Sequence, residues 1–315
     1  MRQNNIFLML LKVFFFSSIL VATSAVRAEL KVVTTIKPLH SLIANVMDGV
    51  GEPALIIEGS TSPHSFTLKP SHAKLLEEAD IIFWVGESIE TFMERPLESI
   101  VKNAEVVEFM EVESINKLKF REESIFEDHD DHDDHDDHSG HDHHGHAHGE
   151  FDAHIWLDPI NAKEMVHEIA HELGDLDPAN KNKYEANAQA TIQALDQLVN
   201  DIEKGINKDA KFVVFHDAYQ YFEERFGVRA AGALTLNTDV LPGAKQIADI
   251  QDVIKDRGIK CIFSEPQFNP KIITTIAEDM NIKTGVFDPL GANIDSNKDL
   301  YFKLIQNLGN ELKGC

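Results

Sequence analysis

The sequence predicts an α/β protein made of two similar lobes that a long, rigid helix joins. Before residue 110 and again after residue 210, short apolar, β-rich segments alternate with amphipathic helical segments, an alternation typical of α/β folds. A polar segment with helical periodicity lies between the two regions. We therefore expect an N-terminal lobe at residues 29–176, a linker helix at 177–206 and a C-terminal lobe at 207–315.

Strands and helices alternate in the predicted N-terminal lobe. Apolar, β-rich runs predict strands at residues 30–35, 54–57, 80–85 and 105–109, and an amphipathic segment predicts a helix at 38–50. Asp158 and Pro159 are a suitable start for a second helix, because Asp is a good N-cap and Pro fits the first turn. Gly174 is expected to end that helix.

The linker is predicted to be one uninterrupted helix. Asp177 is a good N-cap and Pro178 a good first-turn residue, and apolar side chains follow at helical spacing as far as Gly205. A helix of about 27 residues would be near 40 Å long and would make a stiff connector. The alternative is a bundle helix inside one domain, which the α/β pattern on both sides disfavours.

The predicted C-terminal lobe repeats the alternation of the first lobe. Strands are expected at 211–215, 261–264 and 283–287, and helices at 218–226, 244–255 and 270–280. The repetition implies that the two halves of the chain fold similarly.

The first 28 residues have the features of a secretory signal peptide. An apolar run at 6–21 follows Arg2, and the sequence Val-Arg-Ala at 26–28 predicts cleavage after Ala28. A signal anchor is the alternative. No later apolar run is long enough to span a bilayer, so we expect the mature protein to be soluble and outside the cytoplasm.

Two cysteines, Cys261 and Cys315, are the only ones in the sequence. In an oxidising compartment an even pair usually forms a disulfide, and only one pairing exists here. The alternative is a pair of unrelated thiols.

The formal net charge of the whole chain is −24. A strongly negative protein is a poor partner for nucleic acid or an anionic membrane. The same charge raises the local concentration of cations, which favours cationic ligands.

A tract at residues 127–150 is dominated by histidine and aspartate. Imidazole is a common ligand of transition metals, and the interleaved carboxylates attract cations. Because the tract has almost no apolar side chains, we expect a disordered loop. The alternative is an acidic insertion that binds metal only incidentally. Its nine candidate auxiliary ligands are His129, His132, His135, His138, His141, His143, His144, His146 and His148.

Four residues outside the tract are candidate ligands of a tighter metal site: His64, His154, His216 and Asp288. In open α/β sheets, ligands bind outside the carboxyl ends of the strands. His216 and Asp288 each directly follow a predicted strand, and His64 lies in the loop after another. Three neutral imidazoles, with a carboxylate or water completing a tetrahedron, would form a zinc site.

A competing pattern is the HExxH sequence formed by His167, Glu168 and His171. In zinc metalloproteases two such histidines hold the metal and the glutamate acts as general base. We find no convincing third ligand, so two exposed histidines on an amphipathic helix are the favoured interpretation. An extracellular metal buffer that relies on the tract is a further alternative.

Several segments together closely resemble the zinc-specific periplasmic solute-binding proteins of ABC uptake transporters, the binding component of the Znu-type system. The most specific are SPHSFTLKPSHAKLLEEADIIFWVGESIETFM, HIWLDP, FVVFHDAYQYFEERFGV, CIFSEPQF and VFDPLGANI. An acidic, histidine-rich insertion before HIWLDP is itself typical of these proteins. The resemblance covers essentially the mature chain and implies a metal site in the cleft between the lobes.

The resemblance also implies the roles of particular residues. The family's three histidine ligands fall on His64, His154 and His216, and the fourth ligand would be Asp288 or water. Some zinc-binding members have a glutamate just before the first histidine, where this chain has Pro63. The cysteine pair matches a family disulfide. The implied function is capture of zinc and its delivery to a membrane permease, by a protein that is not an enzyme and that we expect to be a monomer.

Overall fold

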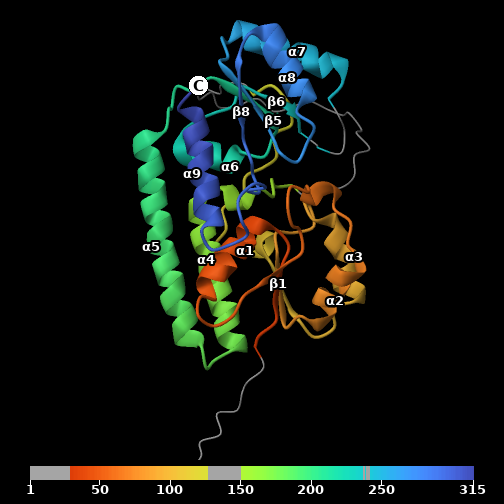
Figure 1. Cartoon of the computed structure of the whole chain (residues 1–315), viewed down its shortest axis with the longest axis vertical. Helices are drawn as coiled ribbons and strands as arrows, with labels where there is room; N and C mark the ends of the chain where they lie inside the picture. The colour runs from red at the N-terminus through yellow and green to blue at the C-terminus, as the bar shows by residue number, and fades with distance from the viewer. Residues whose placement is uncertain (1–28, 127–149, 237, 239–241) are drawn as a thin grey trace, which may run out of the picture.

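The chain folds around two parallel sheets of four strands each, as the computed structural model of residues 29–126, 150–236, 238 and 242–315 shows (Figure 1). The N-terminal sheet has the strand order β2-β1-β3-β4 and the C-terminal sheet the order β6-β5-β7-β8. The two orders are the same topology, so the predicted similarity of the halves is confirmed. Each predicted strand is present to within two residues of its expected bounds.

The strands are β1 (Val32–Thr34), β2 (Ala54–Leu55), β3 (Ile81–Trp84), β4 (Glu105–Glu108), β5 (Phe212–His216), β6 (Ala233–Thr235), β7 (Cys261–Ser264) and β8 (Lys283–Val286). The helices are α1 (Lys37–Val46), α2 (Pro70–Glu78), α3 (Glu94–Ser99), α4 (Pro159–Leu176), α5 (Lys181–Gly205), α6 (Gln220–Phe226), α7 (Ala244–Asp256), α8 (Lys271–Met280) and α9 (Leu300–Leu312). Strand β6 and the helices α2, α3 and α9 were not predicted from the sequence. Within the described residues, no helix is both long and apolar enough to cross a membrane.

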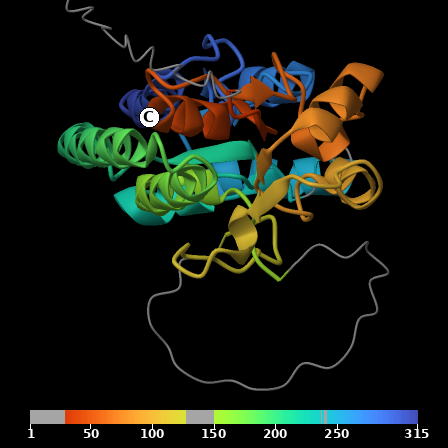
Figure 2. The same cartoon turned by 90° about the horizontal axis from the view of Figure 1, so that it is seen from below.

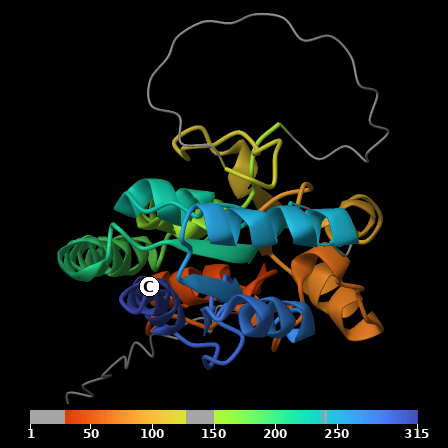
Figure 3. The ribbon, with the colours of Figure 1, turned by 90° about the horizontal axis from the view of Figure 1, so that it is seen from above.

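Helices α4, α5 and α9 connect the two lobes along one flank of the molecule. The pair α4 and α5 lies on the side opposite α2 and α3 in all three views (Figures 1, 2 and 3). One cluster of buried apolar side chains runs without interruption through both lobes, from Val32 in β1 to Leu312 at the end of α9. A shared close-packed core resists relative motion of the lobes.

The linker helix begins later than predicted. Asp177 is the C-cap of α4, residues 178–180 form a turn, and α5 starts at Lys181. The Asp177 carboxylate accepts hydrogen bonds from the side-chain amide of Asn180 and from the Tyr184 hydroxyl, 2.6 and 3.2 Å away. A proline disfavours helical dihedrals in the residue before it. Asp177, which precedes Pro178, therefore ends α4 and does not start the next helix. The 25 residues of α5 still span about 38 Å.

The predicted end of α4 at Gly174 is also wrong, since the helix continues to Leu176. Gly174 lies where α4 meets the start of α5, and a Cβ there would be 3.0 Å from the Lys181 side chain. Glycine in this position permits the close approach of the two helices.

Glu90 is a buried carboxyl group at the carboxyl end of the N-terminal sheet. One oxygen accepts hydrogen bonds from the amides of Val85 and Gly86, at 2.7 and 3.3 Å. Burial raises the pKa of Glu90 to about 7, although these hydrogen bonds oppose the shift. The folded protein therefore holds this proton at pH values where the unfolded chain has released it.

Since the folded state binds more protons than the unfolded state between pH 4.5 and 7, the Glu90 contribution to stability falls as pH rises through this window. By pH 8 ionisation of Glu90 should cost roughly 3 kcal/mol. We expect Glu90→Gln, which keeps an acceptor for both amides, to match the wild type at pH 5 and exceed its stability at pH 8. Urea denaturation at the two pH values checks this; parallel losses of stability in both proteins would contradict it.

Candidate metal centre

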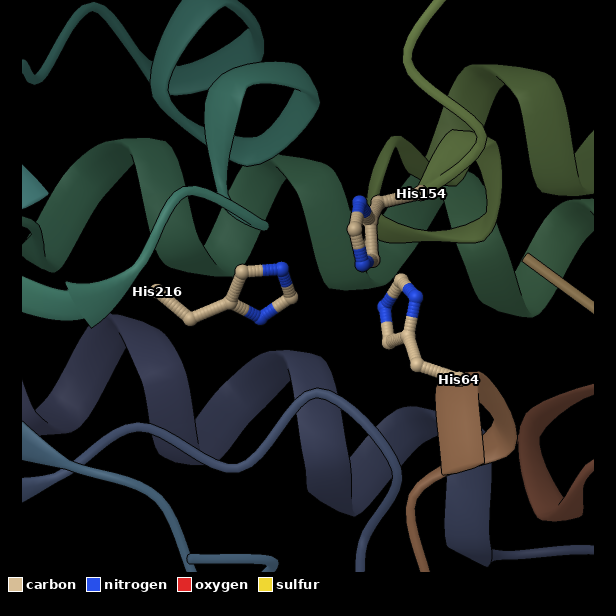
Figure 4. Close-up of side chains that lie close together, drawn as sticks. All are labelled: His64, His154 and His216. Carbon is tan, nitrogen blue, oxygen red and sulfur yellow. The ribbon is translucent and has the colours of Figure 1, made fainter. Parts of the chain in front are cut away.

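Three histidines meet between the lobes (Figure 4). His64 lies in the short 3₁₀ helix η1 (Pro63–Ser65), in the loop after β2. His154 precedes a second 3₁₀ helix, η4 (Ile155–Leu157), and His216 is the last residue of β5. The three predicted imidazoles are thus brought together from distant parts of the sequence.

One nitrogen of each imidazole lies within 4.8 Å of a nitrogen of the other two. Tetrahedral zinc with Zn–N bonds of about 2.1 Å would place its ligand nitrogens about 3.4 Å apart, so a small inward shift of the rings would complete such a site. His154 and His216 are only 4% and 3% exposed. The cavity that the rings line has a volume of about 10 Å³, enough for one ion or one water.

A carboxylate lies beside the Nδ1 atom of two of these rings. Asp152 Oδ1 is 2.7 Å from His154 Nδ1 and also accepts a hydrogen bond from the His154 amide. Glu265 Oε2 is 3.6 Å from His216 Nδ1. Carboxylates in these positions fix the ring orientation and tautomer of metal ligands. The hydrogen bond to Asp152 therefore leaves Nε2 of His154 free to bind a metal, and Glu265 places a negative charge beside His216.

The local charge around His216 favours its protonated form in the absence of metal. Burial acts to lower the pKa of His216, but Glu265, Asp217 and Asp152 together raise it above its ordinary value. A cation in the cavity would take the place of that proton, because imidazole binds metals in its neutral form. The negative surroundings thus favour an ion of positive charge.

Asp158 links α4, the helix after His154, to α6, the helix after His216. This residue is the N-cap of α4, where it accepts a hydrogen bond from the Ile160 amide at 2.8 Å. Its two oxygens also receive a bidentate pair of hydrogen bonds from Arg225 of α6, at 2.7 and 2.8 Å. Bidentate arginine–carboxylate pairs are geometrically specific, so this contact fixes the start of α4 against α6.

Asp288, the fourth predicted ligand, does not join the three histidines in the structure. Its Oδ1 accepts hydrogen bonds from the Gln267 side chain and from the amides of Leu290 and Gly291, while Oδ2 accepts one from Ala292. The carboxylate thus caps the backbone of its own loop. A short acidic side chain often bonds to amides two or more residues ahead, and here that local interaction takes both oxygens.

The HExxH residues lie on α4 and form no metal site in the described part of the chain. The histidine cluster is the single group of potential ligands found there. His167 and His171 are exposed, and His171 contacts the neighbouring Glu172 and Asp175 side chains. The favoured interpretation, two exposed histidines on a helix, agrees with this placement.

The sequence analysis did not identify Asp152 or Glu265. Glu265 directly follows β7, so the same strand-end argument that selected His216 applies to it. Asp152 stands two positions before His154, and at this spacing an aspartate side chain can accept a hydrogen bond from the later residue's backbone amide. The nine histidines of the tract and the predicted signal peptide lie outside the described residues.

The fold and the site together define a two-lobed metal-binding protein. The family described as zinc-uptake complex component A, periplasmic, matches residues 32–315, and the chain belongs to this family. The predicted disulfide between Cys261 and Cys315 is also confirmed.

Named relatives agree with this assignment, and a solved structure shares the fold. A high-affinity zinc uptake system protein ZnuA of Brucella abortus (strain 2308) is 47% identical over 303 residues, covering 90% of this chain and 91% of the relative. The ZnuA protein of Yersinia pestis is 32% identical, covering 95% of each chain. A crystal structure of a ZnuA deletion mutant with zinc bound has a TM-score of 0.70 and 22% identity, covering 90% of this chain and 98% of that one.

Proposed function

We propose that this protein captures zinc outside the cytoplasm and delivers it to the membrane permease of an ABC importer. The observation that carries the proposal is the cluster of His64, His154 and His216, two of them buried, around a cavity of about 10 Å³. Imidazole suits zinc, and carboxylate-rich sites suit harder cations such as manganese. The named relatives are zinc uptake proteins, which supports the same ion.

The three histidines are proposed as the protein ligands, with water in the fourth position. Water is preferred to Asp288 because both oxygens of that carboxylate bond to the loop backbone. Zinc is the cargo and no bond is made or broken, so the protein is proposed not to be an enzyme. We further propose that it works as a monomer in the periplasm, after cleavage behind Ala28.

The histidine-rich tract is proposed to collect zinc weakly for the tighter site. The described residues on its two sides are anchored to the fold: the Phe126 amide donates to the Ala231 carbonyl, and the amide of Asp152, which contacts His154, donates to the Leu118 carbonyl. The chain leaves the tract only a few residues before His154. Ions gathered by the tract would therefore be released close to the cleft.

Replacing residues 127–149 with a short Gly-Ser linker should lower the number of zinc ions bound but preserve one tight site. The expectation follows because the three proposed ligands and their carboxylate partners all lie outside the tract. Competition with a calibrated chelator gives both stoichiometry and affinity. If the tight site disappears with the tract, the protein is a metal buffer and the cleft assignment fails.

A further inference from the structure

Lys37, the first residue of α1, reaches across from the N-terminal lobe to a loop of the C-terminal lobe. Its Nζ donates hydrogen bonds to the carbonyl oxygens of Gly291, Ala292 and Ile294, at 2.7, 3.1 and 2.7 Å. Three acceptors match the three N–H groups of an ammonium ion. The residue is only 4% exposed, so the contact is well shielded from water.

Lys37 holds the loop of residues 288–294. Other backbone groups of this loop are hydrogen-bonded as well. Asp288 accepts hydrogen bonds from three of the loop amides, while Lys37 takes three of its carbonyls. The Trp156 indole donates to the Pro289 carbonyl at 2.8 Å. The loop backbone is therefore bonded to both lobes, and in this arrangement Lys37 supplies the positive charge opposite Asp288.

The same loop forms one wall of the metal cavity. Pro289 and Leu290 line that cavity together with His64, His154 and His216. Gly291, directly after them, has a φ of +68°, a conformation that a side chain would disfavour. The position of this apolar wall thus depends on a tightly turned backbone whose carbonyls converge on Lys37.

We propose that Lys37 is a positioning residue of the metal site: by holding the 288–294 loop across the lobe boundary, it keeps Pro289 and Leu290 over the histidine cluster and slows release of the ion. The inference rests on the proposed zinc-binding function. Lys37 touches neither the ion nor its ligands. It acts through a loop that forms one wall of the cavity.

A purely general role in lobe packing is the competing explanation, and the same helix provides its control. Ser41, one turn further along α1, is also buried and also crosses the lobe boundary. Its hydroxyl donates to the Lys298 carbonyl at 2.9 Å and accepts from the Tyr301 amide at 3.0 Å. Ser41→Ala therefore removes interlobe hydrogen bonds without touching the 288–294 loop.

The test compares zinc dissociation from Lys37→Met, Ser41→Ala and the wild type, each with the tract replaced, after addition of excess chelator. Lys37→Met should release zinc at least about tenfold faster, within the range found for outer-sphere partners of metal sites, and Ser41→Ala should stay within about twofold of wild type. Equal rates in the two variants would overturn the proposal. Absence of tight zinc in the wild type would instead refute the proposed function.

A second measurement needs no variant and applies even if Lys37→Met does not fold. Hydrogen exchange at the amides of Leu290, Gly291 and Ala292 should be slow in the zinc-free protein, because Lys37 and Asp288 already hold the loop. Rapid exchange that becomes slow only when zinc is added would show that the ion, and not Lys37, orders the loop, and would overturn the proposal.

Discussion

Replacing His216 with alanine is expected to weaken zinc binding by more than about 100-fold, since loss of even an outer-sphere partner typically costs about 10–100-fold. His216 is at the end of the central strand β5 and is 3% exposed. No other described residue joins the cluster, so the variant is left with two histidine ligands. The affinity is measured by chelator competition on protein without the tract, which would otherwise bind zinc itself.

The matched control for this substitution is His167→Ala. His167 belongs to the HExxH pattern and is exposed on α4, away from the histidine cluster. The substitution should therefore leave zinc affinity unchanged. An equal loss in both variants would contradict the cleft site and favour the metalloprotease pattern. Unchanged affinity in His216→Ala would show that the tight site lies elsewhere.

Removal of the disulfide is expected to reduce the free energy of unfolding by roughly 4 kcal/mol, from the loop-closure entropy of the unfolded chain. Cys261 in β7 and Cys315 after α9 are 54 residues apart in sequence. The bond ties the C-terminal end to the central part of the C-terminal sheet. Because α9 also packs against α1 and α5, its loosening should affect both lobes.

Urea denaturation of the double variant Cys261→Ala, Cys315→Ser against the oxidised wild type measures this effect. Adding a reductant should destabilise the wild type and leave the variant unchanged, which separates loss of the bond from loss of the side chains. Equal unfolding midpoints for the variant and the oxidised wild type would contradict the prediction.

Every described strand except β6 could be predicted, because parallel strands are short apolar runs with clear ends; β6 is only three residues long. The sequence was less reliable at helix ends. The pair Asp177 and Pro178 suits the start of a helix and equally suits the end of the preceding one, and the choice depends on the chain reversal between α4 and α5. Gly174 was misjudged for a similar reason, since its small size serves a contact between helices.

In the candidate site, too, single residues could be chosen from the local sequence, but the contacts between them depend on the tertiary structure. His216 could be selected as a strand-end residue, but its meeting with His64 and His154 depends on the packing of two sheets and could be implied only by resemblance. Asp288 follows β8 closely, and its local hydrogen bonds decided its orientation. The contact between Lys37 and the 288–294 loop joins residues about 250 positions apart and leaves no mark in the local sequence.

The most direct test of the account is the position of zinc in crystals of the zinc-loaded protein, located by anomalous scattering at the zinc edge. We expect a peak between the three imidazoles, within bonding distance of Nε2 of His154 and His216 and of one nitrogen of His64. Zinc peaks on other residues, with none between these three rings, would contradict the proposed cleft site.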